Sequence, residues 1–149
     1  MHIVLICRLA ALPALALLAT CSGGEPAANL PGGDDTQPFS GIAADETLRF
    51  TGTEPFWGGE VTGGRLIYST MEDQEGREIT VERFAGRGGL SFSGTLESNS
   101  FDMMVTPGRC SDGMSDRAYP FVVTLRIGEE LREGCGWSQK QPFSGSAQP

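Results

Sequence analysis

The chain is short, acidic and almost free of histidine. It has 149 residues, with 19 acidic and 11 basic side chains and a formal net charge of −8. Nothing in it forms a Lys/Arg stripe, and this argues against a nucleic-acid partner, whose phosphates demand basic surface. The single histidine, His2, lies in the N-terminal apolar segment. Histidine-dependent catalysis and histidine metal sites are therefore excluded from the rest of the chain.

Residues 1–20 have the composition of a secretory signal. Arg8 is their only formal charge, and the apolar run 9–19 falls short of the ~20 residues that a membrane-spanning helix needs. The segment ends in LATC, which resembles the bacterial lipobox, where the cysteine is lipidated and becomes the new N-terminus. We predict a lipoprotein signal peptide over 1–20 and a lipid anchor, palmitate included, on Cys21. Cleavage within 14–16 and an uncleaved anchor are the alternatives.

The cysteine count supports the lipid anchor. Cys7 leaves with the signal. Three cysteines then remain, and this odd number would leave one thiol unpaired in an oxidising compartment. Acylation of Cys21 accounts for the odd one and leaves Cys110 and Cys135 to form a disulfide. We therefore predict a bacterial envelope protein, membrane-bound through Cys21. Ser22 after the cysteine favours the outer membrane, facing the periplasm.

Composition divides the mature chain into three parts. The segment 21–46 contains five glycines and three prolines and few large apolar residues, so it cannot bury enough surface to order itself. We predict a lipid-anchored flexible tether there, a β domain over 47–137, and a disordered tail over 138–149.

A repeated pentapeptide flanks the predicted domain. QPFSG occurs at 37–41 and again at 141–145. Coincidence in two Gly/Ser/Pro-rich tails is the preferred interpretation. The alternative is that Phe39 and Phe143 each cap one end of the fold.

The central region alternates apolar and polar residues with a period of two, and no stretch shows a helical period. Such alternation indicates an antiparallel sheet with one buried face, and closure of that sheet would remove its exposed edges. We predict an all-β fold: an antiparallel meander of about eight strands in a closed or nearly closed barrel, with a β-sandwich as the alternative. The expected strands are 47–51, 56–62, 65–70, 78–84, 90–96, 101–105, 121–127 and 130–137.

The last expected strand would place Leu131, Cys135 and Trp137 on one face, because alternate residues of a strand share a side. A barrel of this size is either filled by its own side chains or holds one small ligand. A filled interior would exclude a small ligand there.

The motif TGTEPFW, residues 51–57, is the most distinctive segment. Phe56 and Trp57 are adjacent, so in a strand one fills the core and the other lies at a rim or in solvent. A binding lip, with Trp57 as a stacking surface and Glu54 as a polar anchor, is one interpretation. The preferred one is a plug at the barrel end, with Glu54 accepting backbone N–H bonds.

A second motif, CSDGMSDRAYP, begins at Cys110 and is followed later by GCG. Its preferred interpretation is a disulfide-pinned loop with Asp–Arg pairing. Two nearby carboxylates are too few for a calcium site, and we predict no metal and no cofactor. The candidate binding residues of the two motifs are Glu54, Phe56, Trp57, Asp112, Asp116, Arg117 and Tyr119.

TGTEPFW and CSDGMSDRAYP followed by GCG together resemble a family of uncharacterised bacterial envelope lipoproteins over about residues 50–137. That family has no assigned activity, so the resemblance implies no catalytic residue. The layout is also similar, at the level of fold, to the membrane-bound lysozyme-inhibitor lipoproteins, which are small disulfide-pinned eight-stranded barrels. Those inhibitors act through an exposed Ser and Lys, whereas the only lysine here is Lys140, in the predicted tail.

Three functions follow, in order of preference. The first is a non-enzymatic binding module for a small molecule, a glycan or a basic protein, such as a lysozyme-type hydrolase. The second is a structural or assembly lipoprotein without a ligand. The third is a hydrolase that uses carboxylates, which ranks last because nothing in their spacing places two of them across a cleft. The carboxylates available to it are Glu54, Glu60, Asp112 and Asp116.

Overall fold

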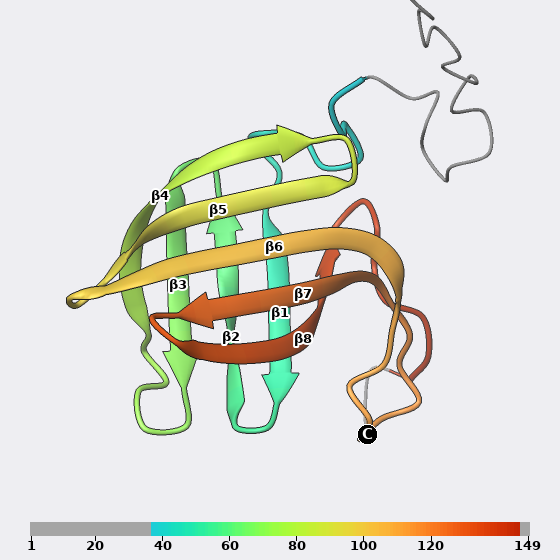
Figure 1. Ribbon diagram of the computed structural model, residues 1–149. Helices are drawn as coiled ribbons and strands as arrows, with labels where there is room; N and C mark the ends of the chain where they lie inside the picture. The colour runs from blue at the N-terminus through green and yellow to red at the C-terminus, as the bar shows by residue number, and fades with distance from the viewer. Residues whose placement is uncertain (1–36, 147–149) are drawn as a thin grey trace, which may run out of the picture.

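The computed structural model describes residues 37–146, and over that range it is an eight-stranded antiparallel barrel without a helix (Figure 1). Each strand pairs with the next, and the last pairs with the first. The predicted fold class is thus confirmed, as a closed barrel rather than a sandwich. The strands are β1 (Leu48–Thr53), β2 (Phe56–Thr62), β3 (Arg65–Thr70), β4 (Arg77–Gly86), β5 (Gly89–Leu96), β6 (Asn99–Cys110), β7 (Tyr119–Ile127) and β8 (Glu130–Ser138).

Tight hairpins give the meander its order. Two-residue links at 63–64 and 128–129 join β2 to β3 and β7 to β8, and Gly63 and Gly128 adopt φ of 59° and 58° there. Such positive φ values suit glycine, which has no Cβ to clash. In Figure 1, β1–β3 cross the direction of β5–β7, so the sheet bends strongly as it closes.

Side chains fill the inside of the barrel. Phe50, Trp57, Tyr68 and Phe101 form a chain of ring contacts, with consecutive centroids 5.8, 6.3 and 5.8 Å apart. Apolar side chains from β1 to β7 pack around them and occupy the interior, as in barrels of this size that are filled by their own side chains. The other strand residues of this core are Leu48, Val61, Leu66, Ile79, Val81, Leu90, Phe92, Met103, Val105, Phe121, Val123 and Leu125.

The strand β8 contributes little to the core. Gly136 pairs with Phe50 of β1 and with Phe121 of β7, both of which point inward, so the even-numbered residues of β8 face the interior. Leu131, Cys135 and Trp137 do share one face, as predicted. It is the outer face, which is why Leu131 remains 63% exposed.

The segment before β1 packs against the barrel. Ile42 is 2% exposed within the core, Phe39 packs on the core's edge, and the amide of Phe39 donates to the carbonyl of Gly86 over 2.8 Å. The flexible tether predicted to extend to residue 46 is therefore wrong for residues 37–46, because two large apolar side chains anchor them. The signal, Cys21 and the rest of the tether lie outside the described residues.

The segment after β8 is also held, so the predicted disordered tail is wrong for residues 138–146. Ser144 exchanges two backbone hydrogen bonds of 2.9 Å with Ala118, and Phe143 packs on Trp137 with ring centroids 5.7 Å apart. The Nε2 of Gln141 donates to the carbonyl of Gly41 over 2.6 Å, which joins the two QPFSG copies. Both copies thus have structural roles, contrary to the preferred interpretation of coincidence.

Candidate functional site

The closing seam of the barrel is paired along only part of its length. β1 and β8 pair at four positions, from Leu48 with Ser138 to Thr51 with Cys135. Beyond that point, 52–53 of β1 and 130–134 of β8 keep their partners in β2 and β7 but have none across the seam. The seam therefore opens at one end.

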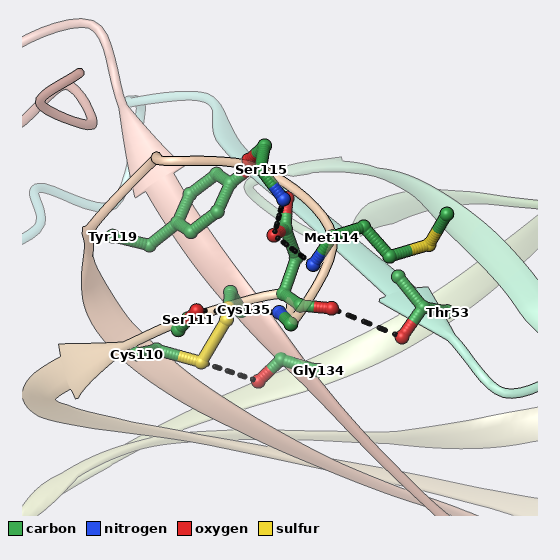
Figure 2. The surroundings of a disulfide bond; sticks show 10 residues. Thr53, Cys110, Ser111, Met114, Ser115, Tyr119, Gly134 and Cys135 are labelled. Carbon is green, nitrogen blue, oxygen red and sulfur yellow. Dashed lines mark hydrogen bonds between the residues drawn. A yellow bond between two sulfur atoms is a disulfide. The ribbon is translucent and has the colours of Figure 1, made fainter. Parts of the chain in front are cut away.

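A groove of about 420 Å³ occupies this opening. Segments from both sequence motifs meet there, together with the stretch of β8 that carries GCG. They are residues 51–54 from TGTEPFW, 110–112 from CSDGMSDRAYP, Val122, and 131–135 of β8. The hydroxyl of Thr53 donates to the backbone carbonyl of Asp112 over 3.3 Å, which ties the first motif directly to the second (Figure 2).

The predicted disulfide forms one wall of the groove. Cys110 and Cys135 are joined, with their Cα atoms 5.6 Å apart, within the usual range for a bridge. The β6–β7 register shifts between Pro107 and Cys110, which marks a bulge at the end of β6. The Sγ of Cys110 lies 3.3 Å from the carbonyl oxygen of Gly134 (Figure 2); this is a packing contact, because a disulfide sulfur carries no hydrogen.

The Asp112 carboxylate organises the loop beside the disulfide. Its oxygens accept from the amides of Ser115 and Met114 over 2.9 and 3.0 Å, and from the hydroxyls of Ser115 and Tyr119 over 2.8 and 3.1 Å. Burial raises the pKa of Asp112, but these hydrogen bonds outweigh it and lower the pKa to about 2. The loop uses this carboxylate for its own structure, with Met114, Ser115 and Tyr119 as its hydrogen-bond partners.

Trp57 lies behind the groove rather than in it. It is 4% exposed, so it cannot serve as the predicted stacking surface. A Cβ added to Gly52 would lie 2.0 Å from its Nε1, and one added to Gly134 would lie 2.9 Å from its ring. The indole thus fills the space that these two glycines leave, as the plug interpretation expects. Phe56 is 46% exposed at the β1–β2 turn.

Tyr119 and Arg117 belong to a neighbouring cluster that holds the C-terminal segment. The ring centroid of Tyr119 is 5.4 Å from those of both Trp137 and Phe143, and the Arg117 guanidinium lies 4.6 Å from the Phe143 centroid. Asp116 is exposed in the same loop. The structure therefore brings only Glu54 and Asp112, of the seven candidates, to the groove wall.

The groove carries two carboxylates that the fold does not use. Glu54 and Glu133 are exposed and form no ion pair or side-chain hydrogen bond with any residue of 37–146. The backbone N–H bonds predicted for Glu54 are not formed. Arg132, the only basic residue of the lining, instead donates to the Tyr68 hydroxyl and pairs with Glu130 at 2.9 Å, with its side chain 14% exposed. The groove is thus acidic at its mouth.

Sequence reasoning missed Glu133 and Leu131 as groove residues. Both lie in a strand whose outward face looks ordinary in the sequence, and only the position of the open seam makes them neighbours of Glu54. No signal in the sequence marks where β1 and β8 cease to pair.

Within residues 37–146, no group of three or more His, Cys, Asp or Glu side chains could hold a metal ion. The same residues include no helix long and apolar enough to cross a membrane. The chain matches no protein-family model, no curated protein and no solved structure. The resemblance to envelope lipoproteins stays a prediction.

Proposed function

We propose that this protein is a lipoprotein of the bacterial envelope, anchored at Cys21, that binds a cationic segment of another protein in the seam groove. Binding, rather than catalysis, is the proposed activity. Lysozyme-type hydrolases are one class of basic protein that could supply such a segment.

One observation carries the proposal: both sequence motifs and β8 converge on a groove whose mouth has two carboxylates that pair with no side chain of residues 37–146. Carboxylates that stabilise a fold are paired or hydrogen-bonded, as Asp112 is. Glu54 and Glu133 leave their acceptor capacity to an external group. An ammonium or guanidinium group is the natural complement, and Arg forms the strongest such pairs.

The charge of the whole domain favours the same partner. The described residues carry 16 acidic and 10 basic side chains, so the net charge around the groove is negative. Such a field accelerates encounter with a cationic protein and repels an anionic one. The packed interior supports a protein partner at the surface over a small molecule inside the barrel.

The test uses the detergent-solubilised mature protein, with egg-white lysozyme as the cationic probe and calorimetry as the readout. We expect saturable binding that weakens as salt rises, because screening shortens the reach of the carboxylates. Glu54→Gln combined with Glu133→Gln should weaken binding at least about tenfold, the scale of losing charged contacts.

Glu82→Gln is the matched control. Glu82 is an exposed carboxylate on β4, which adjoins neither β1 nor β8 in the barrel, and its neutralisation changes the net charge by the same step. If Glu54→Gln and Glu82→Gln lost the same amount of lysozyme affinity, only the net charge would matter, and the groove would not be the binding site. Affinity independent of salt would point to an apolar or small-molecule site instead.

The anchor is tested separately. Cys21→Ser should release the protein from membranes into a soluble form, because acyl chains supply the membrane affinity. Unchanged membrane partitioning of the variant, in cells that process the precursor normally, would contradict the anchor without bearing on the groove.

A further inference from the structure

The open part of the seam leaves a length of β8 with an uncovered backbone edge. The carbonyl oxygen of Thr51 points toward β8. A Cβ atom built on Gly134 of β8 would lie only 2.3 Å from that oxygen. Thr51 and Cys135 are therefore a hydrogen-bonding pair of the antiparallel ladder. Backbone groups point to the same edge at every second residue, so Leu131 and Glu133 turn their N–H and C=O groups into the groove.

Uncovered strand edges are uncommon in native proteins, because they invite another chain to pair with them. Here no described segment pairs with the edge beyond Cys135. The loop that begins at Ser111 reaches only the end of the groove near Thr53. The stretch from Glu130 to Glu133 stays open beside Leu131, which is 63% exposed.

The wall behind the groove suits a peptide backbone. Gly52 and Gly134 present no side chains there, and Trp57 closes the space behind them. The Nε1 of Trp57 lies beside Gly52 and is the only buried side-chain donor in residues 37–146 that lacks an acceptor. A small shift of the backbone at Gly52 would let the indole N–H donate to a backbone carbonyl of a peptide bound in the groove.

The side chains along the rim are of two kinds. Glu54 and Glu133 supply negative charge, while Leu131 and Val122, 63% and 36% exposed, supply an apolar surface in the same groove. An extended peptide has side chains on alternate sides. The side chains on one side of a bound peptide can reach the two carboxylates, while those on the other side meet another part of the groove.

We propose that the cationic partner binds by β-augmentation: an extended segment of the partner adds as a strand along the free edge of β8, with its basic side chains toward Glu54 and Glu133. This inference rests on the proposed function and names the binding mode of the same groove. Main-chain hydrogen bonds would supply affinity, and the two carboxylates would select basic side chains.

The probe is a blocked hexapeptide of three lysines that alternate with three valines, titrated against the solubilised mature protein. Two isomers carry N-methyl groups, either on the lysine amides or on the valine amides. Both keep every side chain and charge, but each loses the hydrogen-bond donors of one edge. We expect one isomer to bind about tenfold more weakly than the parent and the other to bind nearly as well.

Amide hydrogen exchange gives an independent readout. Peptide binding should slow exchange at Leu131 and Glu133, whose amides face the groove, and leave Arg132 unchanged, because its amide already faces β7. Electrostatic attachment alone would not produce this alternation.

Equal binding of both isomers and the parent, or no selective protection of Leu131 and Glu133, would overturn the added strand. No saturable peptide binding at all would also overturn it. The proposed function would survive these results if lysozyme binding still depended on Glu54 and Glu133. The proposed function would fail if the double substitution Glu54→Gln with Glu133→Gln changed the affinity for neither lysozyme nor the peptide.

Discussion

Two adjacent regions of the barrel differ in whether their carboxylates are hydrogen-bonded within the fold. In the loop 110–118, the Asp112 carboxylate accepts four hydrogen bonds, and a disulfide fixes the loop to β8. In the groove beside it, the strands stop pairing, and Glu54 and Glu133 have no side-chain partner among residues 37–146. The same motif residues thus build a rigid wall on one side and leave an unfilled surface on the other.

The difference separates stability from binding. Groups that satisfy one another contribute to the folding free energy, and their removal leaves buried polar atoms unpaired. Groups left to solvent contribute little to folding and remain available to a ligand. Mutations in the loop should therefore act on stability, and mutations at the mouth of the groove should act on binding.

Loss of the disulfide should have the largest effect. Cys110→Ala with Cys135→Ala removes the link between the loop and β8, across 25 positions of sequence, and should lower the free energy of unfolding by about 2–4 kcal/mol. Urea unfolding measures the change, and Trp137 should become more exposed in fluorescence. Two free thiols in the non-reduced mature protein would contradict the structure itself.

Gly134→Ala should disturb the boundary between the two regions. The added Cβ would lie 2.3 Å from the Thr51 carbonyl and 2.9 Å from the Trp57 ring, and a backbone atom cannot move away cheaply. We expect a loss of about 1–3 kcal/mol in thermal or urea unfolding. Gly88→Ala is the control, because its added Cβ meets nothing within 4 Å. Equal stability of the two variants would refute this close packing.

The Asp112 loop should be sensitive to acid. Its pKa is lowered from 3.8 to about 2 in the folded protein, so its contribution is complete above about pH 4 and is lost as pH falls toward 2. Asp112→Asn should cost about 1–2 kcal/mol at neutral pH, and the difference from wild type should shrink across that window. Urea unfolding at several pH values measures this. Asp116→Asn, in the same loop but exposed, should change stability by less than ~0.5 kcal/mol. A pH-independent difference for Asp112→Asn would contradict the assignment.

The smallest effect on stability should come from the groove. Glu54→Gln and Glu133→Gln, singly or together, should shift the free energy of unfolding by less than ~0.5 kcal/mol, because neither carboxylate has a partner to lose within the described part of the chain. The same urea experiment checks this. A loss comparable to that of Asp112→Asn would show that these carboxylates support the fold, and the contrast with the loop would disappear.

The alternation of apolar residues is enough to predict eight strands and a barrel. In β7, for example, Phe121, Val123 and Leu125 point inward and Val122 points outward, as the pattern indicates. The disulfide follows from counting cysteines. These features depend on local periodicity and on simple chemistry, which a single sequence records well.

The orientation of β8 could not be predicted in the same way. Its larger apolar residues, Leu131 and Trp137, lie on the outer face, and the inner face carries Gly134 and Gly136. The reason is volume: side chains from other strands already fill the space in front of these glycines, Trp57 at Gly134 and Val123 with Phe121 at Gly136. Such competition for interior volume is a property of the assembled barrel and leaves no local mark.

The candidate site depends on two further tertiary facts. The end of β1–β8 pairing at Thr51 and Cys135 creates the groove, and the sequence contains no break at either position. The flanking segments are likewise held by Phe39 and Phe143, whose surroundings look like those of any Gly/Ser/Pro-rich tail.

The chain direction of β1 sets the side from which a partner can approach the groove. The N-terminal segment joins β1 at Leu48, near the meeting of the two QPFSG copies, whereas the groove opens beyond Thr51, toward the opposite end of the strand (Figure 1). The anchor proposed at Cys21 would therefore lead into the barrel from the end of β1 that lies away from the groove. The lipid surface would then leave the groove unobstructed, so that a soluble partner could dock without first displacing the barrel from the membrane.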